Sequence, residues 1–312
     1  MNILVTGGCG YIGTILVPRL LDLGHDVTVV DIMWFGNYLA AHKDLKVVNE
    51  DTRNIDNVHL DGVDAVIHLA NVANDPCGEL NAKLSWEVNA LATMRLIDKA
   101  VHSKVKQFLF ACSGSVYGIK EEPQVTEELT LVPVSDYNKT KMVAERVLLS
   151  YKDDMIVQSI RPATVCGYSP RMRLDVSVNM LTMQALAKGK ITVFGGTQVR
   201  PNINIKDIVN IFIFFLENGD KYTGIYNAGF ENISILDIAK KVTAFVPAKI
   251  IVSESNDPRS YRLNSDKLLS TGFKPQYGVV NAIEEIIKVF REGKLQDEEK
   301  YYNLKTMKRL AI

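Results

Sequence analysis

Short apolar runs alternate with amphipathic stretches over the first half of the chain. Residues 2–5 (NILV) predict a buried strand, and residues 11–24 carry apolar side chains at helical spacing up to Gly24. The same alternation predicts further strands at 25–31, 45–51, 64–70, 106–113 and 155–162, and helices over 79–103 and 136–152. Apolar strands that alternate with helices are typical of an α/β protein, in which helices cover both faces of a parallel sheet.

The pattern changes after about residue 165, where strands become shorter and Arg, Pro and Asn appear in the loops. We expect short strands at 191–194, 203–205, 225–229 and 249–253, and helices near 176–188, 206–218, 234–245 and 279–292. No repeat or low-complexity linker separates the two halves. The sequence therefore predicts a first domain at 1–165 and a smaller, mixed part at 166–312. We expect them to share a core, and the chain can cross back between them. The conformation of the charged tail at 293–312 stays open.

Three glycines, Gly7, Gly10 and Gly13, follow the first predicted strand directly. They stand at the strand-to-helix turn of a βαβ unit, where bare backbone lets a pyrophosphate approach the amides at the helix N-terminus. Asp31 ends the second strand of the unit. A carboxylate there can accept hydrogen bonds from both ribose hydroxyls of an adenosine, and it would repel a 2′-phosphate. The unit therefore predicts a site for NAD rather than NADP.

Composition and charge narrow the class of protein. Lys and Arg equal Asp and Glu at 36 each, so the chain has no overall basic footprint for nucleic acid. The apolar stretch at 208–219 is too short to span a bilayer, and the N-terminus lacks the basic region of a signal peptide. The four cysteines show no CxxC pairing, and the five histidines show no metal-ligand spacing. We expect buried, reduced thiols, no metal, no membrane partner and a cytoplasmic location.

A second motif pairs Tyr137 with Lys141 on one face of the helix predicted at 136–152. Oxidation of an alcohol by NAD needs a base for the hydroxyl proton, and a free phenol with a pKa of about 10 is too weak at neutral pH. A nearby ammonium and a positive nicotinamide lower that pKa. Ser113 ends the strand at 106–113 and can hydrogen-bond the substrate oxygen. Ser115 is a second candidate for that oxygen, or alternatively a cap for the following turn.

The glycine loop GxxGxxG, the segment CSGSVYG at 112–118 and YNKTK at 137–141 together resemble the extended short-chain dehydrogenase/reductases. The resemblance is to their NAD-dependent nucleotide-sugar epimerase/dehydratase family. It covers nearly the whole chain and includes 51–54, 68–70, 87–89, 161–167 and 200–208. It implies a Rossmann-type doubly wound parallel sheet, NAD as cofactor and a nucleotide-diphosphate sugar as substrate. It also implies a homodimer formed through two helices per subunit, here at 82–102 and 137–151.

The resemblance also implies roles for individual residues. Those expected at the cofactor are Gly7, Gly10, Tyr11, Ile12, Gly13, Asp31, Ile32, Asp51, Thr52, Leu69, Ala70, Ala73, Asn89, Tyr137, Lys141, Pro162 and Val165. Those expected at the substrate are Asn74, Asn179, Arg171, Arg173, Arg200 and Arg259. A structural role is the alternative for Asn89, as a buried helix amide. Arg171 and Arg173 have a similar alternative as surface arginines paired with Asp175 or with solvent.

Departures from the family pattern bear on the reaction. No carboxylate follows Ser113, where the family's 4,6-dehydratases carry an Asp–Glu pair, and Cys112 lacks a convincing His partner for 3,5-epimerisation. We therefore predict an NAD-dependent nucleotide-sugar 4-epimerase that acts by transient oxidation at C4. A dehydrogenase or ketoreductase that releases the keto sugar would use the same residues, and it stays open as an alternative. A non-catalytic NAD-sensing protein is a third alternative, which the presence of both Tyr137 and Lys141 disfavours.

Overall fold

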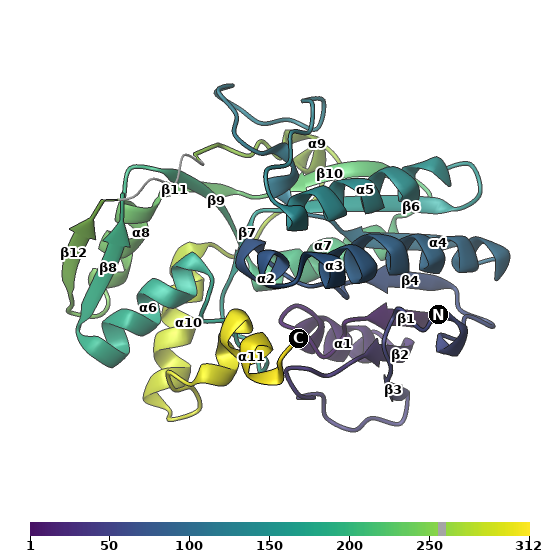
Figure 1. Ribbon diagram of the computed structural model, residues 1–312, viewed down its shortest axis with the longest axis horizontal. Coiled ribbons are helices and arrows are strands. Elements are labelled where there is room, and N and C mark those ends of the chain that lie inside the picture. Colours follow the sequence, from purple (N-terminus) through teal and green to yellow (C-terminus); the bar gives the residue numbers. More distant parts are fainter. Residues whose placement is uncertain (255–259) are drawn as a thin grey trace.

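The computed structural model describes residues 1–254 and 260–312, and its centre is a parallel sheet of seven strands (Figure 1). The strand order is β10-β6-β5-β4-β1-β2-β3. The strands are β1 (Asn2–Thr6), β2 (Asp26–Asp31), β3 (Leu45–Asn49), β4 (Ala65–His68), β5 (Gln107–Ala111), β6 (Ile156–Pro162) and β10 (Gly224–Ala228). From β1 the sheet extends through β2 to β3 on one side, and through β4, β5 and β6 to β10 on the other. This doubly wound topology confirms the predicted fold class and places a crevice beyond the carboxyl ends of β1 and β4.

Helices cover both faces of this sheet. They are α1 (Gly13–Asp22), α2 (Asp75–Leu80), α3 (Ala82–Ser85), a π-helical segment (Trp86–Ala92), α4 (Thr93–His102), α5 (Asp136–Ser150) and α7 (Ile205–Glu217). Helix α4 packs against α5 on one face, and α1 packs against α7 on the other (Figure 1). Two connections are short 3-10 turns at Ile55–Asn57 and Gly114–Tyr117. The strand ends are therefore held between two helical layers.

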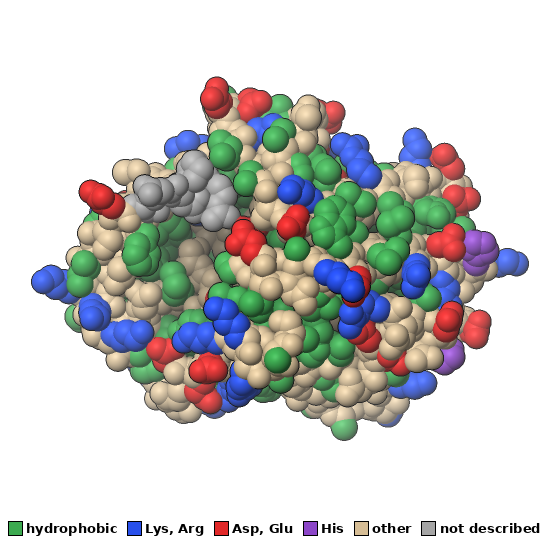
Figure 2. Space-filling view, viewed as in Figure 1, with side chains coloured by type: hydrophobic (Ala, Val, Ile, Leu, Met, Phe, Trp, Pro, Cys, Tyr) green, Lys and Arg blue, Asp and Glu red, His purple; other side chains and the backbone are tan. Residues whose placement is uncertain are grey.

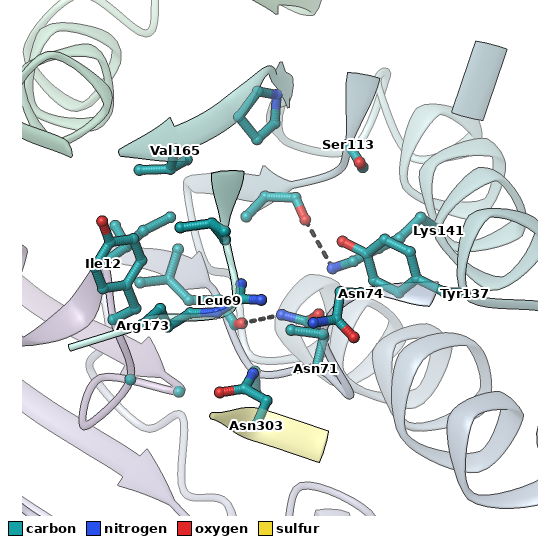
Figure 3. A pocket seen from close by; sticks show the side chains of 18 of the residues that line it. Ile12, Leu69, Asn71, Asn74, Ser113, Tyr137, Lys141, Val165, Arg173 and Asn303 are labelled. Atoms are coloured by element: carbon teal, nitrogen blue, oxygen red, sulfur yellow. Dashed lines mark hydrogen bonds between the residues drawn. The ribbon is translucent and has the colours of Figure 1, made fainter. Parts of the chain in front are cut away.

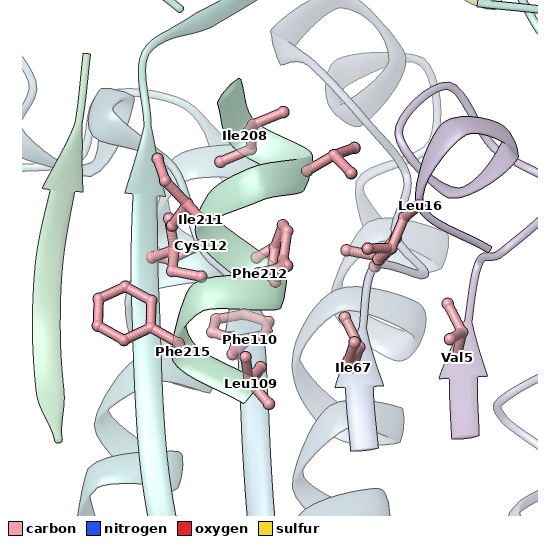
Figure 4. Close-up of a cluster of buried hydrophobic side chains, with 14 of the residues drawn as sticks. Val5, Leu16, Ile67, Leu109, Phe110, Cys112, Ile208, Ile211, Phe212 and Phe215 are labelled. Atoms are coloured by element: carbon pink, nitrogen blue, oxygen red, sulfur yellow. The ribbon is translucent and has the colours of Figure 1, made fainter. Parts of the chain in front are cut away.

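The core between α7 and the sheet is almost entirely apolar. All residues of β4 and β5 are buried, as expected for central strands covered on both faces. Phe212 and Phe215 of α7 lie beside Leu109 and Phe110 of β5 (Figure 4). Burying one such side chain stabilises the fold by about 1.5–3 kcal/mol. This packing fixes the carboxyl end of β5, which leads into Ser113.

The second half of the chain builds a smaller mixed part. Its elements are β7 (Thr164–Cys166), α6 (Ser177–Lys188), β8 (Lys190–Phe194), β9 (Val199–Asn204), β11 (Glu231–Ser234), α8 (Ile235–Thr243), β12 (Lys249–Ser253), α9 (Asp266–Leu269) and α10 (Val279–Arg291). They form a sheet ordered β11-β9-β7 and a pair β12-β8, packed around a separate apolar cluster. The chain also crosses back, because β10 pairs with β6 and α7 covers the main sheet.

Several elements differ from the sequence-based expectation. The helix expected over 79–103 begins at Asp75 and includes the π-helical segment, because Asn74 and then Asn81 each cap a new start. The strand expected at 203–205 begins already at Val199, and β7 and β11 were not predicted. The charged tail contains a 3-10 turn (Glu299–Tyr301) and α11 (Asn303–Leu310), which packs against α2.

Other expectations concern thiols and membranes. All four cysteines are free and buried. Among the described residues, no helix combines the length and the apolar character that a membrane span needs.

Candidate active site

A cavity of about 480 Å³ opens at the carboxyl ends of the central strands, where the two parts of the chain meet (Figure 3). It brings together most of the residues predicted from the sequence. Those that line it are Gly7, Gly10, Tyr11, Ile12, Gly13, Asp31, Ile32, Asp51, Thr52, Leu69, Ala70, Ala73, Asn74, Ser113, Ser115, Tyr137, Lys141, Pro162, Val165, Arg171, Arg173 and Arg200. Asn89 and Asn179 do not line it, and Arg259 lies outside the described residues.

The glycine loop has the shape that a pyrophosphate needs. Gly7 has a φ of +71°, and a Cβ there would meet the backbone nitrogen of Ala70 at 2.5 Å. A Cβ on Gly13 would meet the carbonyl oxygen of Gly8 at 2.4 Å, so both positions require glycine for close packing. A Cβ on Gly10 would meet the Gly7 carbonyl oxygen at 3.0 Å. Gly10 also lines the cavity, so a ligand there can approach the Gly10 backbone closely. Helix α1 begins at Gly13, so the positive end of its dipole lies at this loop. This loop fits the pyrophosphate of NAD.

Asp31 lies at the end of β2 and lines the same cavity. Its Oδ2 accepts a hydrogen bond from the Cys9 amide at 3.0 Å, and its Oδ1 accepts one from the Met33 amide at 2.7 Å. Burial raises the pKa of this carboxyl, and the two backbone hydrogen bonds oppose the rise. Each carboxylate oxygen keeps a further lone pair, so the side chain fits the two ribose hydroxyls of an adenosine. Asp51 and Thr52, beyond the end of the neighbouring β3, line the cavity beside it.

Helix α5 brings Tyr137 and Lys141 to the opposite end of the cavity. Ser135 caps this helix by accepting a hydrogen bond from the Asn138 amide at 3.2 Å. The Lys141 ammonium is buried, donates to the carbonyl oxygen of Ala111 at 2.8 Å and lies 4.8 Å from the centre of the Phe110 ring. Tyr137 and Lys141 lie side by side, with Ser113 across from them (Figure 3).

The two serines of the CSGSVYG segment are linked to each other. Their hydroxyl oxygens, on Ser113 and Ser115, lie 2.7 Å apart. The Ser115 hydroxyl also donates to the side-chain oxygen of Asn138 on α5. Ser113 in turn caps the 3-10 turn by accepting a hydrogen bond from the Ser115 amide at 3.2 Å. This arrangement ties the strand end to the helix that carries Tyr137 and Lys141.

The electrostatics of the pair differ from the expectation in one respect. Burial raises the pKa of the Tyr137 phenol, while the side chains of Ser113 and Arg173 oppose the rise. Burial lowers the pKa of Lys141 to about 8. The sequence predicts that Lys141 lowers the phenol pKa, but in the chain alone the loss of hydration outweighs any such effect.

Two amides expected at the ligands serve the scaffold instead. Asn89 accepts a hydrogen bond from the Val72 amide at 2.7 Å and donates to the Val72 carbonyl at 3.1 Å and to the Thr140 hydroxyl at 3.2 Å. Asn179 accepts from the Gly167 amide at 2.9 Å and donates to the Tyr11 hydroxyl at 3.0 Å and the Arg173 carbonyl at 2.9 Å. All polar atoms of both amides are thereby engaged within the chain. They position the loops that line the cavity.

Asp175 is the centre of a buried polar cluster inside the cavity. Arg173 donates to it twice, from Nε at 2.9 Å and from Nη2 at 3.2 Å. The Asn74 amide donates to the same carboxylate at 3.1 Å. Asn74 also has a φ of 73°, a conformation that costs a non-glycine residue about 1–3 kcal/mol. The ion pair considered for Arg173 therefore forms, but it is largely buried rather than on the surface.

The other arginines reach the cavity from different segments. The Arg171 guanidinium lies 4.0 Å from the centre of the Phe35 ring; Arg173 and Asp175 act on it more strongly than Asp31 does. It therefore lies near the Asp175 cluster with Asp31 also in reach, and its expected contact with the substrate stays a prediction. Arg200 reaches the cavity from β9.

Several lining residues were missed by sequence reasoning. They include Trp34, Phe35, Asn71, Asp175, Ile235, Tyr261 and Asn303. Trp34 and Phe35 could have been found, because two aromatic residues closely follow the acidic end of a strand in a ligand crevice. Asn303 carries no such local signal, since only the tertiary path of the tail brings it to the site.

The chain is similar to known nucleotide-sugar enzymes in sequence and in fold. Residues 3–229 match the family model described as "NAD dependent epimerase/dehydratase family". A UDP-glucose 4-epimerase of Lactobacillus helveticus is 28% identical over 314 residues, which cover 91% of this chain and 94% of that protein. UDP-glucuronic acid decarboxylase 1 of Xenopus tropicalis is 26% identical over 311 residues, which cover 93% of this chain and 72% of that protein.

A solved structure with bound ligands is also similar. A UDP-glucuronic acid 4-epimerase from Bacillus cereus, in complex with UDP-glucuronic acid and NAD, matches with a TM-score of 0.81 and 25% identity. The match covers 94% of this chain and 99% of that chain. The doubly wound sheet and the smaller second part are therefore shared with a nucleotide-sugar enzyme.

Proposed function

Because the chain belongs to the NAD-dependent epimerase/dehydratase family, we propose that it is a 4-epimerase of a uridine diphosphate sugar. NAD is the cofactor, and the chain is an NAD-dependent nucleotide-sugar enzyme of the extended short-chain dehydrogenase/reductase type. The observation that carries the finer proposal is the convergence of Tyr137, Lys141 and Ser113 in one cavity. Asp31 and the glycine loop line the other end of that cavity.

In this proposal the chain's own residues manage a proton at the C4 oxygen of the sugar. The glycine loop and Asp31 would hold NAD, which would supply the acceptor and donor for the hydride at C4. Tyr137 accepts the hydroxyl proton as C4 is oxidised and gives it back when C4 is reduced. Ser113 donates a hydrogen bond to the same oxygen. Lys141, held by Ala111 and Phe110, supplies a positive charge beside the phenol.

The substrate diphosphate has cationic partners on the C-terminal side of the cavity. Arg200 reaches the cavity from β9, and Arg173 lies deep within the cavity on the loop before α6. A guanidinium suits a diphosphate because its planar donors match two phosphate oxygens at once. Uridine is proposed on the names of the relatives, which act on UDP-glucose or UDP-glucuronic acid.

The polar groups around Ser113 favour inversion over dehydration. Segment 113–118 contributes only hydroxyls, with no carboxylate to expel a hydroxyl group as water. Asp175 is engaged by Arg173 and Asn74, and Asp75 accepts a hydrogen bond from Ser135 at 2.5 Å. Hydrogen transfer at one carbinol carbon needs none of these carboxylates.

The test is incubation of the purified protein with UDP-glucose, UDP-galactose and UDP-glucuronic acid, followed by proton NMR and absorbance at the NADH wavelength. We expect a C4-inverted sugar with no net NADH. Accumulation of NADH and a keto sugar would replace the proposal by a dehydrogenase. Release of carbon dioxide from UDP-glucuronic acid would replace it by a decarboxylase. No turnover of any of the three would overturn it.

We also propose a homodimer through the helices at 82–102 and 137–151. Hydrophobic side chains lie on the face that carries α4 and α5 (Figure 2). Trp86, Leu91 and Met94 are between 37% and 44% exposed in this part of the chain. Large apolar side chains that are exposed close together are typical of a protein–protein interface. Sedimentation equilibrium should give twice the chain mass, and Leu91→Glu should halve it. A wild-type monomer at micromolar concentration would contradict the proposal.

A further inference from the structure

The C-terminal segment, residues 299–312, returns to the cavity and is fastened to one of its loops. The Leu174 amide donates to the carbonyl of Tyr301 at 2.9 Å. Arg171 donates from Nη2 to the Asn303 side-chain oxygen at 2.6 Å. The backbone N–H of Asn303 donates to Asp175 Oδ2 at 3.3 Å. Three hydrogen bonds thus join residues 301–303 to the loop at 171–175, whose Arg171, Arg173 and Asp175 line the cavity.

Helix α11 adds an apolar contact on the same side. Met307 is 1% exposed and is the buried centre of this contact. Its cluster contains Val72, Cys77, Leu84 and Val88, and Trp34, Phe35, Leu304 and Ile312 pack against it. The helix therefore bridges the turn after Asp31 and helix α2. Trp34, Phe35 and Val88 of this cluster also line the cavity, so α11 supports its wall from behind.

Arg171 is where the two contacts meet. Its guanidinium lies 4.0 Å from the centre of the Phe35 ring, and the residue is 3% exposed. Among the described residues, its hydrogen-bond acceptors are neutral: the Asn303 side-chain oxygen at 2.6 Å and the Met172 carbonyl at 2.9 Å. Arg173, Asp175 and Asp31 act on this guanidinium through space, and a buried charge of this kind is stabilised by an anionic partner. Asp31, whose carboxyl Arg171 influences through space, lines the same cavity, and the adenosine side of NAD is proposed to bind at that carboxyl.

We infer that the C-terminal segment completes the NAD site, with Asn303 holding Arg171 against Phe35 so that the guanidinium meets the cofactor pyrophosphate. Arg171 is then a cofactor ligand, and Asn303 is the positioning residue behind it. The wall formed by α11 slows the release of the cofactor. This deepens the proposed function, because an epimerase regains its oxidised cofactor in every cycle and has no need to release it.

The rate at which NADH leaves the protein tests the inference without any sugar substrate. The chain has two tryptophans, and Trp34 lines the cavity, so energy transfer from tryptophan to NADH reports binding. NADH is displaced by excess NAD in a stopped-flow instrument. Asn303→Ala removes a hydrogen bond to a charged group, and we expect NADH to dissociate about tenfold faster. Lys308→Ala, an exposed position on the same helix, is the matched control and should dissociate at the wild-type rate.

A wild-type dissociation rate in folded Asn303→Ala would overturn the inference, and so would equal acceleration in Lys308→Ala. A second measurement needs no variant. Hydrogen–deuterium exchange of residues 301–310 should slow several-fold when the wild-type protein is saturated with NAD. Unchanged exchange there, with slowed exchange in the glycine loop, would also overturn it. Neither readout depends on epimerisation, so failure of the sugar assay and failure of this inference are separate results.

Discussion

The ammonium of Lys141 donates a hydrogen bond of 2.8 Å to the backbone carbonyl of Ala111, the last residue of β5. This contact joins helix α5, which carries Tyr137, to the strand end that leads into Ser113, and the Ser115–Asn138 hydrogen bond joins the same two segments. The three chemically active side chains are therefore positioned by hydrogen bonds between the strand end and the helix. The ammonium is also kept within reach of the site although it is 1% exposed.

The burial of Lys141 predicts a pH-dependent stability penalty. Its pKa falls from 10.5 to about 8 on folding, so between these values the unfolded chain binds more protons than the folded one. Stability contributed by this group therefore rises with pH through that window, and the penalty is fully present below about pH 8. Its size is on the order of 3 kcal/mol. Lys141→Met removes the penalty, so the variant should gain on the wild type at neutral pH and lose that gain by about pH 10.5.

Urea unfolding of both proteins without cofactor, at a series of pH values, measures this difference. Lys139→Met, two positions away on the exposed side of α5, is the control and should track the wild type. The Ala111 carbonyl loses its partner in Lys141→Met, but that loss is the same at every pH. A difference between wild type and Lys141→Met that stays constant with pH would contradict the shift.

The buried pair Glu145–Arg161 fixes the other side of α5. Arg161 donates to both Glu145 oxygens, at 2.9 and 2.5 Å, and the side chains are 0% and 1% exposed for Glu145 and Arg161. Glu145→Gln leaves a buried guanidinium without a counter-charge. We expect the free energy of unfolding to fall by about 3–5 kcal/mol, measured by denaturant titration. The double variant with Met at both positions should recover most of it; a single variant as stable as the wild type would refute the assignment.

Asp31 should set the preference for NAD over NADP. Asp31→Asn keeps the shape of the side chain but removes the charge that repels a 2′-phosphate. We expect the ratio of the dissociation constants for NADPH and NADH to fall by about tenfold, or about 1.4 kcal/mol. Tryptophan fluorescence titration with each reduced cofactor measures both constants. An unchanged ratio would count against this role for Asp31.

The two serines near β5 should differ in their effect on turnover. Ser113 stands at the strand end facing Tyr137, whereas the Ser115 hydroxyl is engaged by Asn138. Ser113→Ala should lower kcat by about 10²-fold, and Ser115→Ala should lower it by less than about tenfold. Steady-state kinetics with saturating sugar nucleotide compares them. The reverse order would assign the substrate oxygen to Ser115.

Tyr137→Phe should lower kcat at least ~10²-fold, the lower limit for removal of a general acid–base group. Phenylalanine keeps the ring and the Cβ that lies close to Gly78 of α2, so NADH binding and thermal stability should stay close to those of the wild type. Turnover near the wild-type level would remove Tyr137 from the mechanism, while loss of NADH binding would make the variant a structural defect.

The local part of the fold could be predicted from sequence because its signals are local. The glycine loop, Asp31 and the Tyr137–Lys141 spacing each lie within one βαβ unit or one helix, and the structure places them in a single cavity. The return of β10 to β6 depends on strand pairing over about sixty residues, which no local pattern reports.

The role of the tail could not be predicted for the same reason. Residues 299–312 read as a charged segment, and their function depends on contacts with Arg171, Leu174 and Asp175 far away in sequence. Asn89 and Asn179 show the opposite error. Their types and positions match ligand contacts, but tertiary packing uses every polar atom of their amides within the chain. Sequence motifs locate a residue near a site more reliably than they distinguish a ligand contact from a support.

The most direct test of the account uses a uridine diphosphate hexose that carries deuterium at C4. If C4 is inverted by oxidation and reduction within one site, as proposed for the Tyr137, Lys141 and Ser113 cavity, the hydrogen never meets solvent. The C4 epimer formed in ordinary water should then keep its deuterium at C4, as measured by NMR and mass spectrometry. Loss of the deuterium to solvent during inversion would contradict the account.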